Sequence, residues 1–289
     1  MTRQESYARA LAELLGAGSR VGRVVRSDRE LEQVVREAVD GAPIYWFPHM
    51  TLIGPRVIES LGLCCENFYG GAVSHSHEAT KLLFRPLWND SEVRPAGWNE
   101  YFSAAVAKHA IPGHAVFRRK DLIEATTAIL DRFGRARLKL PTGSDGDGQF
   151  VIRSPRDLDR ALPDPAELLP GGAVVEVDLK ETRTCAVTFL QLGNLRATAI
   201  GEHHRDTNNP EVQHQSGADY LTSLGPPEAM KLEAAPMGES LGRSVMELGT
   251  TLDQALRLHL PQLLVTRRNY QIIDGVDQRG RHHRGMLEQ

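Results

Sequence analysis

The segment from Leu138 to Gln149, LKLPTGSDGDGQ, has the composition of a loop that binds phosphate. Three glycines follow a lysine, Lys139, and lie between two runs of apolar residues. Glycine lets backbone N–H groups approach phosphate oxygens that bulkier residues would block, and the lysine adds a positive charge. The glycines are equally compatible with a plain hairpin loop. A Walker loop is excluded, because that motif opens a helix and this segment leads into a strand.

The last strand pair supplies a second group of candidate residues. With a turn centred between Gln278 and Arg279, Asn269 would pair with Glu288 on one face of the sheet. An amide and a carboxylate on one face suit Mg²⁺, which takes one or two such ligands and leaves its other positions to phosphates and water. Arg267 lies on the same face and would contact a transferring phosphate. A solvated hairpin face is the alternative, and one bulge would change the register.

Helical and strand patterns surround both groups. A helix is predicted over 121–133, where apolar residues recur at helical spacing, and strands are predicted over 136–140 and 149–152, on either side of the glycine loop. Ser154 and Pro155 then favour the start of another helix. Further strands are predicted at 173–177, 184–192, 195–200 and 263–273, a helix at 241–259, a last strand ending at Glu288, and loops over 201–242.

The first part of the chain alternates helices with short apolar strands. Helices are predicted over 7–15 and 51–61, and a buried strand over 44–47. This alternation indicates an open α/β lobe. A long connector over 70–113 follows and carries a helix near 99–109.

Composition limits the class of protein. The 289 residues are 41% hydrophobic and 25% charged, as in globular proteins, and the net charge of −3 gives no reason to expect nucleic acid or an anionic membrane as a partner. No apolar run approaches the ~20 residues of a membrane span. The three cysteines form neither a CxxC pair nor a disulfide framework, which indicates a reducing, cytoplasmic location. The histidines match no HExxH or zinc-knuckle spacing.

The order of these features resembles the ATP-grasp superfamily. Strand, lysine, glycine loop, strand and helix are followed by Val-Val-Glu-Val-Asp-Leu at 174–179, a hairpin, and a late strand pair ending in a glutamate. Phe-Tyr-Gly-Gly-Ala-Val-Ser-His at 68–75 is similar to a bacterial branch of unknown function. The resemblance implies an α+β (α/β) fold, in which an N-terminal α/β lobe, 1–79, precedes two α+β lobes, 80–178 and 179–289, that clamp ATP.

The resemblance also implies roles for individual residues. Lys81 and Lys139 would hold the phosphates, and Lys139 and Arg267 would act as catalytic cations. A mobile lid over the phosphates would be formed by Gly143, Ser144, Gly146 and Gly148. A hinge that binds the nucleoside would be formed by Glu176, Val177 and Leu179. The metal site would be formed by Asn269 and Glu288.

Three features depart from the family pattern. Asp145 and Asp147 bring negative charge into the lid, where it repels phosphate. Asn269 stands where a carboxylate is usual and is a weaker ligand for Mg²⁺. The sequence ends at Gln289, where the family continues with a second metal ligand, an arginine and a glycine pair.

The sequence therefore predicts an ATP-dependent ligase that activates a carboxylate as an acyl phosphate for attack by an amine or a thiol. ATP and Mg²⁺ are the expected cofactors, and small-molecule carboxylates and amines or thiols the expected partners, with a homodimer left open. A nucleotide-binding or partner-binding module without catalysis and an ATP-dependent phosphotransferase are the alternatives. His203, Arg205 and Asn208 are candidate substrate contacts within 201–242.

Overall fold

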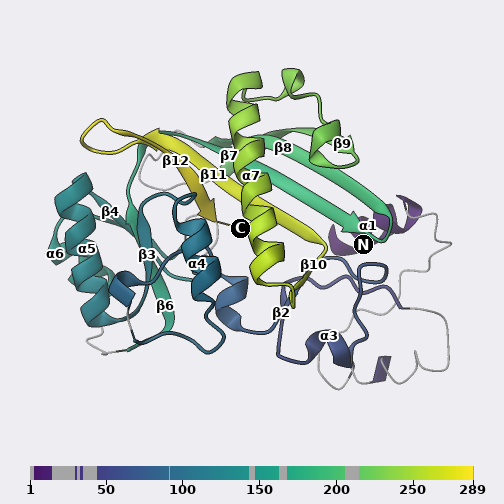
Figure 1. The fold of residues 1–289 in the computed structure, drawn as a ribbon, viewed down its shortest axis with the longest axis horizontal. Helices are drawn as coiled ribbons and strands as arrows, with labels where there is room; N and C mark the ends of the chain where they lie inside the picture. Colours follow the sequence, from purple (N-terminus) through teal and green to yellow (C-terminus); the bar gives the residue numbers. More distant parts are fainter. Residues whose placement is uncertain are drawn as a thin grey trace.

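The computed structural model describes residues 3–14, 30, 33–34, 44–90, 92–142, 147–162, 168–205 and 215–288. Within these residues the chain is a mixed α+β protein built around three β-sheets (Figure 1). The α+β class predicted from the sequence is confirmed. No helix in this part of the chain is long and apolar enough to cross a membrane.

A four-stranded antiparallel sheet carries Lys139. Its strand order is β3 (Gly113–Arg118), β6 (Leu168–Val177), β4 (Ala136–Lys139) and β5 (Gln149–Ile152). Helix α5 (Arg119–Phe133) packs on one face through an apolar stripe that includes Leu122 and Ile129, and α6 (Pro155–Ala161) follows β5. Leu138 packs with α5, so Lys139, the next residue, lies on the opposite face.

A five-stranded antiparallel sheet carries the C-terminal residues. Its order is β12 (His282–Glu288), β11 (Arg267–Val276), β7 (Lys180–Leu192), β8 (Leu195–Arg205) and β9 (Gln215–Leu224). Helix α7 (Glu239–His259) lies along one face of this sheet (Figure 1). Tyr270 and Ile272 pack with α7. Because side chains alternate along a strand, Arg267, Asn269 and Gln271 lie on the opposite face.

The third sheet joins two early strands to a strand that lies about 190 residues later in the chain. Strands β1 (Leu52–Ile53) and β2 (Gly71–Val73) are parallel, and β10 (Leu264–Val265) pairs antiparallel with β2. The helix predicted over 51–61 is therefore wrong in its first half, since only α3 (Val57–Ser60) is helical. The strand predicted over 44–47 is reduced to a single bridge between Trp46 and Phe68.

Several short elements and one long strand complete the fold. Helix α1 (Arg3–Leu14) precedes the sheets, and α4 (Glu100–Ala107) is capped by the side chain of Asn99. Four 3₁₀ turns are η1 (Ser76–Ala79), η2 (Trp88–Asp90), η3 (Pro227–Ala229) and η4 (Leu232–Ala234). The region 201–242, which is predicted to contain loops, also contains the end of β8 and all of β9. Polar and small residues obscure the strand pattern of β9 in the sequence.

Strand β12 links the two larger sheets. Met286 forms a bridge with Ala110, accepts from the N–H of Ile111 at 3.4 Å and donates to the carbonyl of His109 at 2.8 Å. Gly285 permits this approach, because a Cβ there would lie 2.6 Å from the backbone nitrogen of Ile111. The chain passes from the four-stranded to the five-stranded sheet between Val177 and Lys180. The lobe boundaries themselves stay a prediction.

Candidate functional site

Five charged side chains from distant parts of the chain meet between the two larger sheets. These residues, called the charge cluster below, are Lys81, Arg85, Lys139, Glu176 and Glu288. Lys139 Nζ lies 2.6 Å from Glu176 Oε1, and Arg85 Nη2 lies 2.6 Å from Glu176 Oε2. Lys81 Nζ lies 3.5 Å from Glu288 Oε2, and the charge of Glu288 also acts on Lys139. Three of these positions, Lys81, Lys139 and Glu288, are predicted phosphate and metal contacts, and the fold brings them together.

The inner part of the cluster is removed from water. Arg85 is 0% exposed, and Lys139 and Glu176 are each 1% exposed. Burial lowers the pKa of Lys139, although the charges of Glu176 and Glu288 oppose this effect. Burial alone would raise the pKa of Glu176, but Lys139 and Arg85 outweigh it and lower that pKa. The cluster therefore holds buried charges that compensate one another.

Five buried polar atoms of this region have no hydrogen-bond partner among the described residues: Lys81 Nζ, Arg85 Nε, Lys139 Nζ, Gln271 Oε1 and Glu288 Oε2. An ammonium group has three N–H donors, so one close carboxylate leaves each lysine with donors to spare. Buried polar groups without partners are rare in folded proteins and need an explanation. Two ammonium groups near a carboxylate and an amide oxygen suit a ligand that carries both phosphate oxygens and a divalent cation.

The oxygen donors come from β11 and β12, in a register that differs from the prediction. Glu288 pairs with Gln271: the hairpin is shifted by one residue from the predicted register, and a bulge between Gln271 and Ile272 shifts the pairing by one more. The predicted pairing of Asn269 with Glu288 is therefore wrong. Asn269 pairs with Thr188 of β7, and its amide oxygen accepts a hydrogen bond from Thr188 Oγ1 at 2.7 Å.

Gln271 therefore lies beside Glu288 as a second oxygen donor. Asn269 lies on the same face of β11, two residues away. The described residues contain no group of three or more His, Cys, Asp or Glu side chains that could hold a metal ion. A carboxylate with one or two amides still fits Mg²⁺, provided phosphate oxygens complete its coordination.

The remaining predicted residues lie around the cluster or outside the described chain. Gly143, Ser144 and Gly146 lie outside it, as does Asp145. Gly148 has a positive φ of 67° and accepts from the N–H of Leu140 at 2.8 Å, as expected at the end of a hairpin loop. The loop thus connects antiparallel strands, and its predicted role as a lid over phosphate stays a prediction.

The predicted nucleoside-binding hinge lies at the end of β6. Both oxygens of Glu176 are engaged by cations, so its side chain has contacts other than the adenine and ribose contacts that the resemblance implies. The N–H of Val177 donates to the carbonyl of Pro112 at 2.9 Å. The side chains of Val177 and Leu179 belong to the core under α5. Nucleoside binding by this segment stays a prediction.

One row of paired residues, called the floor below, extends from the cluster across the five-stranded sheet. The row Glu288, Gln271, Ala186, Gly201 and Tyr220 crosses all five strands in register. A Cβ at Gly201 would lie 2.4 Å from the Tyr220 ring, so the glycine lets that ring lie across β8.

Two residues singled out in the sequence, His203 and Arg267, act on Tyr220 of this row. Tyr220 Oη lies 3.2 Å from His203 Nε2, which places one predicted substrate contact on the floor. Arg267 is exposed, and its charge lowers the pKa of Tyr220, although burial has the larger effect and raises it. Arg205 ends β8, and Asn208 lies outside the described residues.

Sequence reasoning missed three residues of the site. Arg85 follows the apolar run Leu-Leu-Phe, and a charge in such a run is a signal of a buried ion pair. Gln271 alternates with Arg267 and Asn269, so it belongs to their face of the strand. Gly113 pairs with Glu176, and a Cβ there would lie 2.6 Å from Glu176 Cβ. No local pattern marks that glycine.

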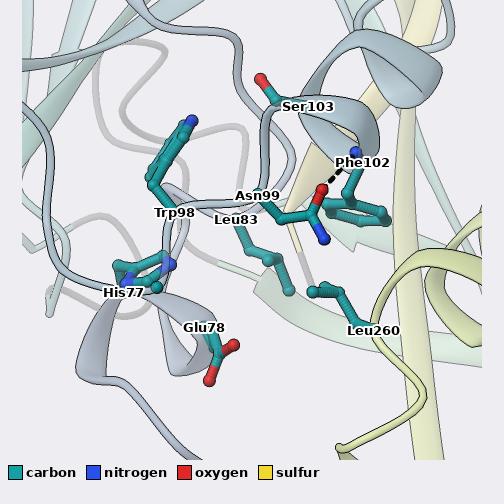
Figure 2. Close-up of a pocket in the computed structure, with 9 residues that line it drawn as sticks. His77, Glu78, Leu83, Trp98, Asn99, Phe102, Ser103 and Leu260 are labelled. Atoms are coloured by element: carbon teal, nitrogen blue, oxygen red, sulfur yellow. Dashed lines mark hydrogen bonds between the residues drawn. The ribbon is translucent and has the colours of Figure 1, made fainter. Parts of the chain in front are cut away.

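A small pocket lies beside the segment that carries Lys81 and Arg85 (Figure 2). Its lining includes His77, Glu78 and Trp98, and Ser103, whose hydroxyl donates to the carbonyl of Arg85 at 3.4 Å. Glu78 Oε2 accepts from the backbone N–H groups of Ser74 and His75 at 2.9 and 2.8 Å. Burial lowers the pKa of His77 to about 4, and the neighbouring His75 adds to this effect. The hydrogen bonds of Glu78 beside this pocket thus hold the turn that leads to Lys81.

The whole sequence, residues 1–289, matches a single family model, described as "Protein of unknown function (DUF3182)". The chain belongs to this family. No curated protein matches the DUF3182 chain by sequence.

Solved structures similar to the DUF3182 chain are ATP-grasp enzymes, as the sequence motifs predicted. N5-carboxyaminoimidazole synthetase from Staphylococcus aureus, complexed with ADP, is 13% identical and aligns over 94% of this chain and 60% of its own, with a TM-score of 0.45. D-alanine–D-alanine ligase from Bacillus anthracis is 11% identical over 100% of this chain and 83% of its own, with a TM-score of 0.42.

The biotin carboxylase domain of 2-oxoglutarate carboxylase from Hydrogenobacter thermophilus, in complex with MgADP, is 16% identical over 90% of this chain and 50% of its own, with a TM-score of 0.45. The DUF3182 chain spans only 41% of another solved structure, an ADP complex of N5-carboxyaminoimidazole ribonucleotide synthetase. None of these similarities assigns an activity or a substrate to this chain.

Proposed function

We propose that this protein is an ATP-dependent ligase that activates a carboxylate as an acyl phosphate and joins it to an amine or a thiol. The observation that carries the proposal is that Lys81, Lys139 and Glu288 meet, with Gln271 paired to Glu288, and that each has a buried polar atom without a hydrogen-bond partner among the described residues. Cations alone would suit any anion. Cations beside carboxylate and amide oxygens favour a polyphosphate bound together with Mg²⁺.

The two lysines would bind the phosphate oxygens of ATP. They approach from different elements, Lys81 from the turn after η1 and Lys139 from β4, so they can grip a phosphate chain from two sides. Glu288 and Gln271, with Asn269 beside them, would hold Mg²⁺, which when bound neutralises negative charge on the phosphates. The loop between β4 and β5 follows directly after Lys139 and would cover the same phosphates.

The proposed reaction has two balanced steps. A substrate carboxylate oxygen forms a bond to the terminal phosphorus as the bond from that phosphorus to ADP breaks. The amine or thiol then bonds to the acyl carbon, phosphate leaves with the C–O bond electrons, and the nucleophile loses a proton. The chain contributes mainly positioning and charge stabilisation. Lys81, Lys139 and Arg267 would stabilise the charge on the transferring group, and removing one such donor typically slows a reaction by about 10²–10³-fold.

A nucleotide-binding module without catalysis is the second candidate. The amide of Asn269 already accepts a hydrogen bond from Thr188, and the described residues offer no cluster of three acidic, His or Cys ligands. Both observations favour a weak metal site. Such a protein would bind nucleotide without turnover, and the bound nucleotide would change its affinity for a partner, such as a second copy of the chain.

Hydroxylamine trapping tests the proposal. We would incubate the protein with ATP, Mg²⁺, hydroxylamine and a panel of small carboxylic acids, and measure ADP and hydroxamate. A ligase produces both in equal amounts, because hydroxylamine intercepts the acyl phosphate. ADP without hydroxamate would indicate a phosphotransferase with a hydroxyl acceptor. Nucleotide binding with neither product would support the second candidate, and Lys139→Met serves as the inactive control.

A further inference from the structure

Glu176 has two cationic partners that are held very differently. Arg85 is anchored by carbonyl oxygens as well as by Glu176: Nη1 donates to Met286 at 3.2 Å and to Phe84 at 3.3 Å, and Nη2 donates to Leu287 at 2.9 Å. Among the described residues, Lys139 Nζ forms one ion pair, with Glu176, and has no hydrogen-bond partner. Arg85 is therefore fixed, and Lys139 is free to turn to another acceptor.

Glu176 sets a physical condition on any such movement. At 1% exposure its carboxylate has no water to compensate it. If Lys139 left it without another partner, an unpaired buried charge would remain, which is strongly unfavourable. Arg85 Nη2 lies 2.6 Å from the second oxygen of Glu176, on the side that Lys139 does not use. The carboxylate therefore keeps one counter-ion when Lys139 departs.

We infer that Arg85 is a positioning residue for nucleotide binding: it is the fixed counter-ion of Glu176 that allows Lys139 to transfer its ammonium group from Glu176 to a phosphate. The inference rests on the proposed function, since it concerns the same site. It assigns Glu176 as the resting partner of Lys139 in the free protein. Arg85 itself contacts no substrate.

The chemistry of arginine suits this role better than that of lysine. A planar guanidinium carries five N–H donors in a rigid fork, so it can bind a carboxylate and several carbonyls at once. Arg85 stays charged in a dry site, whereas burial lowers the pKa of Lys139. Its bonds to Met286 and Leu287 also hold the strand residues next to Glu288, so one side chain orients two parts of the site.

The net charge of the cluster supports the same role. With Lys81, Arg85 and Lys139 against Glu176 and Glu288, the cluster has an excess of one positive charge. Without Arg85 the charges balance, and the attraction for an anionic ligand is lost. Lys139 would then also be the sole counter-ion of Glu176 and would stay on it.

The test measures binding of Mg²⁺ with inorganic tripolyphosphate, which has no adenine to contact the hinge, by calorimetry. We expect Arg85→Met to weaken binding at least about tenfold. Glu176→Gln alone should bind as tightly as the original protein or more tightly. The double variant should recover most of the loss, because a neutral amide needs no counter-ion. A purely structural arginine predicts no recovery, and weak binding by the double variant or by Glu176→Gln alone would overturn the inference.

A second measurement covers the case in which Arg85→Met does not fold. Arg85→Lys keeps a positive charge but offers fewer donors in a different geometry, and we expect intermediate affinity for tripolyphosphate. In NMR titrations of ¹³C-lysine-labelled protein, Lys139 should titrate at higher pH in this variant, because a looser counter-ion leaves more of the Glu176 charge to it. An unchanged Lys139 titration together with unchanged affinity would refute the inference.

The controls separate this inference from the proposed function. Arg119→Met removes an arginine that bonds Asp159 and the carbonyl of Leu162, away from the cluster, and should bind tripolyphosphate normally. Absence of MgATP and tripolyphosphate binding in the original protein would overturn the proposed function. Normal binding by the original protein and equal binding by Arg85→Met would overturn the role of Arg85 alone.

Discussion

Lys139 combines two properties that make it the best single residue for testing phosphate binding. Its ammonium group is buried, and its one close partner leaves it with unused donors. Such a group gains most from a phosphate that approaches within hydrogen-bond distance, because charge-assisted bonds are strong where water is excluded.

We expect Lys139→Met to abolish the rise in melting temperature that MgATP causes in the original protein, by weakening nucleotide affinity at least about tenfold. Arg85 still neutralises Glu176 in this variant, so it should fold. Thermal denaturation with and without MgATP measures the effect. Lys120→Met is the matched control, since Lys120 is an exposed lysine of α5 near Glu124. A full thermal shift in Lys139→Met would show that this lysine does not bind phosphate.

The buried thiol of Cys185 gives a second prediction at this scale. Burial raises its pKa to about 12, with Glu202 adding to the effect, and thiolates rather than thiols react with disulfide reagents. In a Cys64→Ser, Cys65→Ser background, Cys185 of the folded protein should react with such a reagent at pH 8 at least about 100-fold more slowly than in urea. Equal rates would show that β7 is open to solvent.

At the scale of elements, we expect the contribution of the 3₁₀ turn η1 to the stability of the fold to depend on pH. His77 is neutral in the fold down to about pH 4, whereas an unfolded histidine protonates near pH 6.5. The stability that the neutral His77 contributes is therefore fully present above pH 6.5 and is lost as pH falls from 6.5 to about 4. Over this range the free energy of unfolding should fall by about 2–3 kcal/mol. We expect the stability of His77→Gln, measured by urea unfolding, to fall less steeply over this range.

Carboxylates titrate over part of the same range, so the slopes of the two proteins must be compared rather than their absolute stabilities. His204→Gln is the control, because His204 is exposed on β8 and lies beside Asp219. Parallel curves for His77→Gln and the original protein would contradict the assignment of His77 as a buried neutral histidine.

The close contact between β12 and the segment before β3 gives a second prediction for an element. In Gly285→Ala the new methyl group would meet the backbone of Ala110 and Ile111 at 2.7 and 2.6 Å, and backbone cannot move aside as a side chain can. We expect a loss of about 1–3 kcal/mol in the free energy of unfolding. Gly217→Ala in β9 is the control, since its nearest contact would be an ordinary 3.8 Å. A larger loss for Gly217→Ala than for Gly285→Ala would contradict this arrangement.

For the whole molecule, the position of the charge cluster between two sheets predicts how a ligand affects dynamics. Lys139 belongs to the four-stranded sheet and Glu288 to the five-stranded sheet. A nucleotide that binds both should slow hydrogen exchange in β4 and β12 together, since binding stabilises the closed state over local openings. Hydrogen-exchange mass spectrometry with MgATP measures this. Protection confined to one sheet would contradict a site shared between them.

Much of the secondary structure follows from local pattern. Helices α5 and α7 and strands β4 and β5 were predicted within a few residues, because an apolar stripe or alternation specifies each of them without reference to the rest of the chain. Lys139 and Glu288 were singled out by their places beside a glycine loop and at a strand end, and Lys81 by the family resemblance; their roles in phosphate and metal binding stay predictions.

Only the tertiary structure decided how these residues meet. The turn and the bulge at Gln271 each shifted the pairing by one residue and so placed Gln271, rather than Asn269, opposite Glu288; alternation in the sequence reveals neither shift. The pairing of Arg85 with Glu176 joins residues 91 positions apart, and β10 completes a sheet begun near Leu52. A buried charge must find its counter-charge somewhere in the fold, but sequence alone does not say where.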